Sequence, residues 1–143
     1  MKRALWLAFL AALAAGGWFG WRWVAGGFRL SGTVLVSHRY QKRLETPNMV
    51  MFVTAANVGG VPVAVKKFVN PTLPLDWKMG PEDMILPGRD WDGTLSVRVT
   101  VNQHGKVGEV RLGDLLGEHR HPVQSGDRSV DVVIDAEATA AAP

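Results

Sequence analysis

Histidines are the side chains in this sequence of 143 residues that are best suited to bind a metal ion. His119 and His121 are separated by one residue, so an extended chain places both imidazoles on one side, at a spacing that a transition metal can use. His104 and His38 would be the further ligands. The pair also stands in a polar, loop-like stretch, where solvated side chains are the simpler interpretation. We therefore expect no metal site and keep His119 and His121 as candidates.

Methionines offer a second chemistry, because soft thioethers bind Cu(I). Met49 and Met51 lie two residues apart, and Met79 and Met84 follow. The same spacing puts Met49 and Met51 on one face of an expected strand, where methionine commonly fills gaps in a core. A periplasmic copper carrier would need these thioethers to converge with the histidines, and it stays an alternative.

The residue types of common catalytic sites form no recognisable pattern. The chain contains no Cys, which excludes a thiol nucleophile, a disulfide, an iron–sulfur cluster and a thiolate zinc site. Its serines lack the G-x-S-x-G elbow, and no P-loop or dinucleotide-binding glycine motif occurs. Glu82-Asp83 and the acids at 90–92 flank turns, where Asp commonly bends the backbone. We expect a protein that is not an enzyme and holds no cofactor.

Two tryptophans, Trp77 and Trp91, stand in the middle of the chain near several prolines. An exposed aromatic side chain beside proline suits docking of a partner protein. The alternative is packing in a core or a turn, which we expect for one of the two. Both are kept as candidates for partner docking.

The N-terminal segment, residues 1–27, is typical of a membrane anchor. Residues 4–21 carry no charge, and as a helix they would span about 27 Å, close to the hydrocarbon thickness of a bilayer. Contact with lipid is expected over residues 4–25. The aromatic residues that would lie at the membrane interface are Trp18, Phe19, Trp21 and Trp23.

A cleaved signal peptide is the alternative to an anchor. Lys2 and Arg3 form a basic n-region, and Ala12-Leu13-Ala14 fits a cleavage site. Cleavage there would leave bare aromatic residues at a free terminus, so we favour the uncleaved anchor. The basic N-terminus predicts a single-pass protein whose N-terminus stays in the cytoplasm and whose C-terminal domain is exported.

The formal net charge of +3 belongs to the N-terminal segment. Residues 1–27 hold Lys2, Arg3 and Arg22 and no acid, so residues 28–143 are balanced. Outside the anchor, cations gather only in short pairs such as Lys42-Arg43 and Lys66-Lys67, which we interpret as solvated. Nucleic acid binding needs larger clusters of cations, so we expect none.

Residues 28–135 are expected to form one small all-β domain. Residues 94–101 alternate without exception, with Leu95, Val97, Val99 and Val101 on one face. Six or seven short strands separated by turn residues favour an antiparallel β-sandwich. Residues 136–143 are small and featureless, and we expect a disordered tail there. The other expected strands are Phe28–Ser37, Met49–Ala56, Val61–Val69, Val107–Leu112 and Ser129–Asp135, with a shorter one at Leu73–Met79.

An ordered set of short sequences across residues 31–135 resembles the C-terminal periplasmic β domain of the CycH-type c-type cytochrome biogenesis proteins. The set consists of SGTV at 31–34, FV at 52–53 with Ala55, PVAVKK at 62–67, LPLD at 73–76, Met84 with Pro87-Gly88, RV at 98–99, GDL at 113–115 and VID at 133–135. That family presents unfolded apocytochrome c to the haem-ligation machinery in the periplasm. Members of that family have two membrane helices and a helical-repeat region ahead of the β domain. Apocytochrome binding is usually assigned to the repeats.

The resemblance implies a role in c-type cytochrome assembly, exerted by protein binding. It also implies that the single-pass anchor lies in the bacterial inner membrane and that the C-terminal domain is in the periplasm. The partners it implies are apocytochrome, haem-ligation proteins or a membrane protein complex. A structural accessory subunit of a cytochrome-containing respiratory or photosynthetic complex is the second interpretation. The identity and stoichiometry of the partner, and the face that binds it, are not encoded in a recognisable motif.

Overall fold

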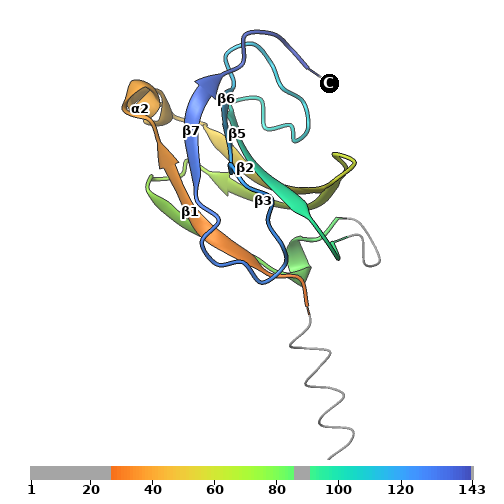
Figure 1. The fold of residues 1–143 in the computed structure, drawn as a ribbon. Coiled ribbons are helices and arrows are strands. Elements are labelled where there is room, and N and C mark those ends of the chain that lie inside the picture. Colours follow the sequence, from red (N-terminus) through yellow and green to blue (C-terminus); the bar gives the residue numbers. More distant parts are fainter. Residues whose placement is uncertain (1–26, 86–90, 143) are drawn as a thin grey trace, which may run out of the picture.

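The computed structural model describes residues 27–85 and 91–142, which form an all-β domain (Figure 1). Seven strands run through this part of the chain, close to most of the expected positions, and three short helices connect them. The strands are β1 (Leu30–Val36), β2 (Val50–Asn57), β3 (Pro62–Val69), β4 (Leu75–Met79), β5 (Leu95–Asn102), β6 (Leu115–Glu118) and β7 (Val132–Glu137). The helices are η1 (His38–Tyr40), α2 (Gln41–Leu44) and η2 (Pro81–Asp83).

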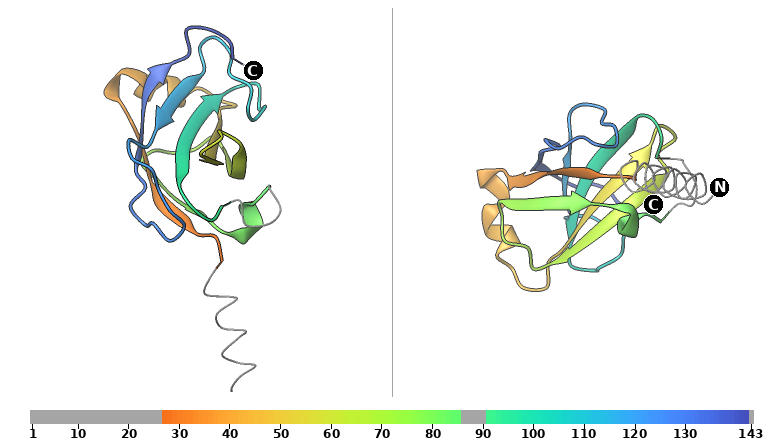
Figure 2. Two further views of the ribbon diagram at one scale, coloured as in Figure 1. Left: turned by 45° about the vertical axis from the view of Figure 1, so that its right-hand side comes forward. Right: turned by 90° about the horizontal axis from the view of Figure 1, so that it is seen from below.

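The seven described strands belong to one hydrogen-bonded sheet, in the order β3-β2-β5-β6-β7-β1-β4. This sheet curls around the core into a sandwich, and its two end strands, β3 and β4, come into contact (Figure 2). The antiparallel expectation is wrong at one pair, because β1 and β7 run parallel, with Val34 beside Val132. Parallel neighbours need a long connection, and most of the domain lies between these two strands.

The core lies between the layers and is built from the alternating faces of the strands. Leu95, Val97, Val99 and Val101 on β5 are all at most 2% exposed, which confirms the face expected from the alternation. Each such side chain contributes roughly 1.5–3 kcal/mol by leaving water. The remaining core side chains include Phe28, Leu30, Val34, Met51, Val53, Val63, Trp77, Leu115, Val132 and Ile134.

The expected strand at Val107–Leu112 is wrong. This stretch is a loop between β5 and β6, and only Val110 forms a bridge there, to Ala142. Gly105 and Gly108 take positive φ angles of 70° and 78°, which a strand does not accommodate. On the side away from β2, β5 pairs with β6, a few residues further along the chain.

The tail expected from Ala136 onward is instead ordered as far as the structure describes it. β7 continues to Glu137, and Ala138 is 7% exposed. Backbone hydrogen bonds join Ala138 N–H to Asp114 C=O at 2.8 Å and Ala142 N–H to Val110 C=O at 2.9 Å. The β5–β6 loop therefore supplies backbone hydrogen-bond acceptors that order this segment, although the sequence of the segment itself has no strand pattern.

The expected membrane anchor lies outside the described residues, apart from Gly27. Within the residues that are described, no helix is long and apolar enough to cross a membrane. Figure 1 shows that β1 begins at one end of the domain and that the described C-terminal residues lie at the opposite end.

Candidate polypeptide-binding groove

β3 and β4 are the two ends of the sheet, so each has one edge without a neighbouring strand. Met84 forms a bridge with Ala64, and Ile85 N–H donates to Val63 C=O at 2.9 Å, which covers the first half of β3. Among the described residues, no strand pairs with Val65–Val69 on this side or with the outer edge of β4. An uncovered edge presents backbone donors and acceptors to which another strand can add.

A groove of about 560 Å³ lies along the seam between these two edges, and we call it the seam groove. Its volume suits a short segment of chain and is far too small for a folded domain. β1, β3 and β4 form its walls, together with the loop that precedes β7. The residues that line the seam groove are Ser31, Gly32, Thr33, Lys66, Phe68, Asp76, Trp77, Lys78 and Arg128.

Alternation along β4 decides how its side chains meet the seam groove. Trp77 is 2% exposed and packs inward, and it is one of the residues that line the groove. Asp76 and Lys78 lie on the opposite, exposed face. The Thr33 hydroxyl on neighbouring β1 donates to Asp76 Oδ1 at 2.8 Å, which holds this carboxylate in place.

The loop before β7 brings Arg128 to the seam groove by running beside the start of β1. Ser31 N–H donates to Asp127 C=O at 3.1 Å, and Val130 N–H donates to Ser31 C=O at 3.0 Å. The Ser31 hydroxyl donates to the Arg128 carbonyl at 3.4 Å. Gly32 permits this approach, because a Cβ atom there would lie 1.9 Å from the Val130 carbonyl oxygen. The backbone of Arg128 is thereby fixed at the groove.

The charge of the seam groove is predominantly positive. Lys66 Nζ lies 3.5 Å from Asp83 Oδ2, so this cation is partly balanced. Neither Lys78 nor Arg128 forms an ion pair with any described residue. Asp76 is the one acidic residue in the lining. With Lys66 paired to Asp83, two cations remain against the carboxylate of Asp76, and this excess favours a ligand that carries negative charge.

Trp77 decides between the two alternatives left for the tryptophans and adds a feature that the sequence does not reveal. Its burial makes it the one that packs in the core. Its indole Nε1–H is the one buried side-chain polar atom of the described chain that lacks a hydrogen-bond partner. An unpaired buried donor costs about 1–3 kcal/mol, and this one belongs to a residue that lines the groove.

Trp91 lies at a larger hollow of about 1160 Å³ next to the start of β1. Its ring is half-buried and meets Phe28 edge-on, with the ring centroids 6.2 Å apart. The hollow shares Lys78 and Arg128 with the seam groove, and its other charged residues are of both signs. Trp91 stays a candidate for partner docking.

The histidine pair is on the surface and has local partners. The rings of His119 and His121 meet edge-on, with their centroids 6.2 Å apart. His119 Nδ1 lies 2.6 Å from the Asp131 carbonyl oxygen, so one of its nitrogens is occupied. His38 is exposed in η1. In the part of the chain that the structure describes, no three His, Cys, Asp or Glu side chains are placed to hold a metal ion.

The methionine candidates are in the core. Met49 is 5% exposed and Met51 is fully buried within the apolar cluster, as their shared strand face indicates. Met79 is also buried. These thioethers pack against apolar side chains and are not brought together with His119 and His121.

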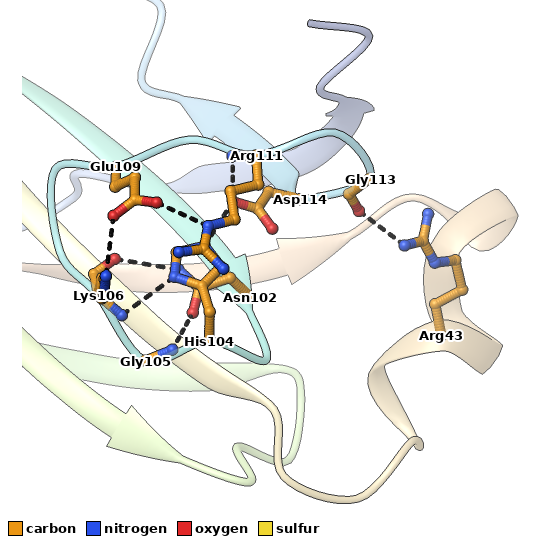
Figure 3. Close-up of polar contacts among 9 residues, drawn as sticks. All are labelled: Arg43, Asn102, His104, Gly105, Lys106, Glu109, Arg111, Gly113 and Asp114. Carbon is orange, nitrogen blue, oxygen red and sulfur yellow. Dashed lines mark hydrogen bonds and ion pairs between the residues drawn. The ribbon is translucent and has the colours of Figure 1, made fainter. Parts of the chain in front are cut away.

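The fourth histidine, His104, belongs to a polar cluster in the β5–β6 loop (Figure 3). His104 Nε2 lies 3.0 Å from Asp114 Oδ2, which also accepts the Arg111 backbone N–H at 2.8 Å. The Asn102 side chain, 2% exposed, accepts the Gly105 backbone N–H at 2.8 Å. These bonds are satisfied within the cluster, so its role is to hold the loop in shape.

An exposed chain of charges surrounds this cluster. Arg111 Nε donates to Glu109 Oε1 at 2.6 Å, and Lys106 Nζ lies 3.6 Å from Glu109 Oε2. The hydrogen bond from Arg111 lowers the pKa of Glu109 below its ordinary value of 4.5. On the other side, Arg43 donates to the Gly113 carbonyl at 2.7 Å and pairs with Glu137.

Sequence reasoning missed most of the seam groove. Lys66 was interpreted only as part of a solvated pair, and no motif marks Lys78 or Arg128 as binding residues. They are distant from each other in the sequence and meet only because β1 lies between β4 and the loop before β7. The expected interface residues Trp18, Phe19, Trp21 and Trp23 lie outside the described residues.

Comparison with known proteins places the domain in a family. No curated protein and no solved structure matches the chain. Residues 30–135 match the family model of the cytochrome c-type biogenesis protein H Ig-like domain, which covers all seven strands except the end of β7. The match spans most of the chain and coincides with the resemblance in the short sequences. The chain therefore belongs to the family of the Ig-like domain of cytochrome c-type biogenesis protein H, and it is related to c-type cytochrome biogenesis.

Proposed function

We propose that this chain is a membrane-anchored periplasmic accessory protein that assists c-type cytochrome assembly by binding an extended segment of a partner polypeptide. The observation that carries the proposal is the seam groove between two uncovered strand edges. Family membership supplies the biological context. The partner would be apocytochrome or a haem-ligation protein.

Strand addition suits this task, because its hydrogen bonds are made to the backbone of the bound segment and so do not require a particular sequence. An extended chain lying beside Val65–Val69 or β4 would form several backbone hydrogen bonds, each worth about 0.5–1.5 kcal/mol net. Ordering the segment costs about 2–5 kcal/mol. The balance predicts weak, reversible binding, which is appropriate for a polypeptide that must be passed on.

An anchor would make such weak binding effective. The uncharged stretch at residues 4–21, with aromatic residues at its end, supports a single membrane span. Holding the domain beside other membrane components raises the effective concentration of a tethered partner to roughly the millimolar range. The proposed location is the periplasmic face of a bacterial inner membrane.

The proposal is tested by purifying the C-terminally tagged full chain in a gentle detergent, with mass spectrometry and a haem spectrum of the eluate. We expect haem-ligation proteins or haem-free apocytochrome in less than equimolar amounts. Equal amounts of the subunits of one haem-containing complex would instead identify a structural accessory subunit and overturn the assembly role.

A pair of charge-reversal variants makes the test specific for the groove. Lys78→Glu with Arg128→Glu inverts two cations of the seam groove and should remove the partner from the eluate. The control is Lys42→Glu with Arg120→Glu, which makes the same change in net charge at exposed positions away from the groove. Equal loss of the partner in both variants would mean that the groove is not the binding site.

A further inference from the structure

We propose that the seam groove recognises an acidic side chain, Asp or Glu, within the extended segment that it binds. This inference rests on the proposed function and adds the chemistry by which one segment is preferred over another. Strand addition by itself is indifferent to sequence, so any preference must come from the side chains that line the groove.

The cations of the groove supply the first part of the argument. Lys78 extends from β4 and Arg128 from the loop beside β1, and neither is paired with a described acid. The one acidic residue in the lining, Asp76, accepts the Thr33 hydroxyl at 2.8 Å. A carboxylate entering the groove would therefore meet two uncommitted cations.

The unpaired indole of Trp77 supplies the second, independent part. Trp77 is one of the residues that line the groove, and its Nε1–H is buried without an acceptor among the described residues. A donor in that position is satisfied by an oxygen from a ligand, and a carboxylate oxygen is a strong acceptor. The amide of Gln would meet the same donor with a neutral and weaker acceptor.

Access to this donor depends on the seam between the end strands. β3 and β4 are in contact but share no ladder of hydrogen bonds in the described chain. The segment after β4 is tied to β3 by the bridge between Met84 and Ala64, and beyond this bridge the seam could widen without breaking a strand ladder. Such widening would let a side chain of the added segment reach Trp77.

The test uses the full chain in detergent micelles and three synthetic peptides of alternating valine and threonine, each long enough to lie beside β3. Two peptides are blocked at both termini and differ only in a central Glu or Gln. The third has the central Gln and a free C-terminal carboxylate. We expect the Glu peptide to bind about tenfold more tightly than the other two in low salt, with the preference reduced as salt rises.

Two further readouts separate recognition from stability. The indole N–H resonance of Trp77, assigned by its loss in Trp77→Phe, should move on addition of the Glu peptide and much less with the Gln peptide. Lys78→Glu with Arg128→Glu should abolish the preference for Glu, whereas Lys42→Glu with Arg120→Glu, away from the groove, should keep it.

The outcomes distinguish this inference from the proposed function. Equal binding of the Glu and Gln peptides would overturn the acidic preference and leave polypeptide binding intact. Tighter binding of the peptide with the free C-terminus would overturn the assignment to an internal side chain. Failure of every peptide to bind would overturn the inference together with the proposed function.

Discussion

Replacement of Trp77 separates its role in the core from its unpaired donor. Trp77→Ala removes a buried aromatic side chain and should lower the free energy of unfolding by about 3–5 kcal/mol. Trp77→Phe removes two ring carbons, which costs about 1.6 kcal/mol at roughly 0.8 kcal/mol each. It also removes the unpaired Nε1–H, and relief of that desolvation cost raises the free energy of unfolding by about 1–3 kcal/mol. The net change for Trp77→Phe should therefore stay within about 1.5 kcal/mol of the unchanged protein.

The measurement is urea unfolding of the full chain in a mild detergent, followed by far-ultraviolet circular dichroism. Circular dichroism is preferred to fluorescence because the chain has 6 Trp. A loss in Trp77→Phe as large as that in Trp77→Ala would refute the reasoning, since it would mean that the indole donor is satisfied. A loss below about 1 kcal/mol in Trp77→Ala would instead refute the placement of Trp77 in the core.

Three further predictions concern the framework around the groove. Gly32→Ala should destabilise the domain by more than about 2 kcal/mol and weaken partner binding, because its Cβ would lie 1.9 Å from the Val130 carbonyl oxygen. Gly60→Ala has open space but a φ of 77°, so in urea unfolding it should cost only the backbone strain of about 1–2 kcal/mol and leave partner binding unchanged. Asp114→Ala should cost about 1–3 kcal/mol and expose the β5–β6 loop to limited proteolysis, because His104 and the Arg111 N–H lose their acceptor; unchanged cleavage would contradict this. The lowered pKa of Glu109 should add stability that is present above the ordinary value of 4.5 and is lost as pH falls through the folded-state pKa. Glu109→Gln should remove this part of the pH dependence, and an identical acid-unfolding curve would contradict the pairing with Arg111.

The strands could be predicted where alternation is strict and fail where glycine interrupts it. The alternation predicts one buried face, and the structure confirms it for Leu95, Val97, Val99 and Val101. The stretch at Val107–Leu112 has the composition of a strand but contains Gly108 at a φ of 78°. Local residue preferences do not show which segment will pair with β5, because pairing is decided by register with distant strands.

The seam groove could not be predicted from the sequence, since its residues come from segments far apart in the chain. Sequence alone identified Trp77 and Trp91 and expected one of them in a core or a turn, but not which one, because aromatic residues near prolines suit both a core and a docking patch. In the structure Trp77 lies opposite Gly32 on β1 and is 2% exposed, so it is the core residue. The parallel pairing of β1 and β7 is equally hidden, since no local pattern reports strand direction.

The most direct test of the central claim is site-specific photo-crosslinking in cells that assemble c-type cytochromes. A benzoylphenylalanine in place of Phe68 would lie in the seam groove, and one in place of Val133 would lie on the outer face of β7. We expect crosslinks to apocytochrome or a haem-ligation protein from position 68 and not from position 133. Crosslinks from position 133 alone, or none from position 68 in a folded variant, would contradict binding in the seam groove.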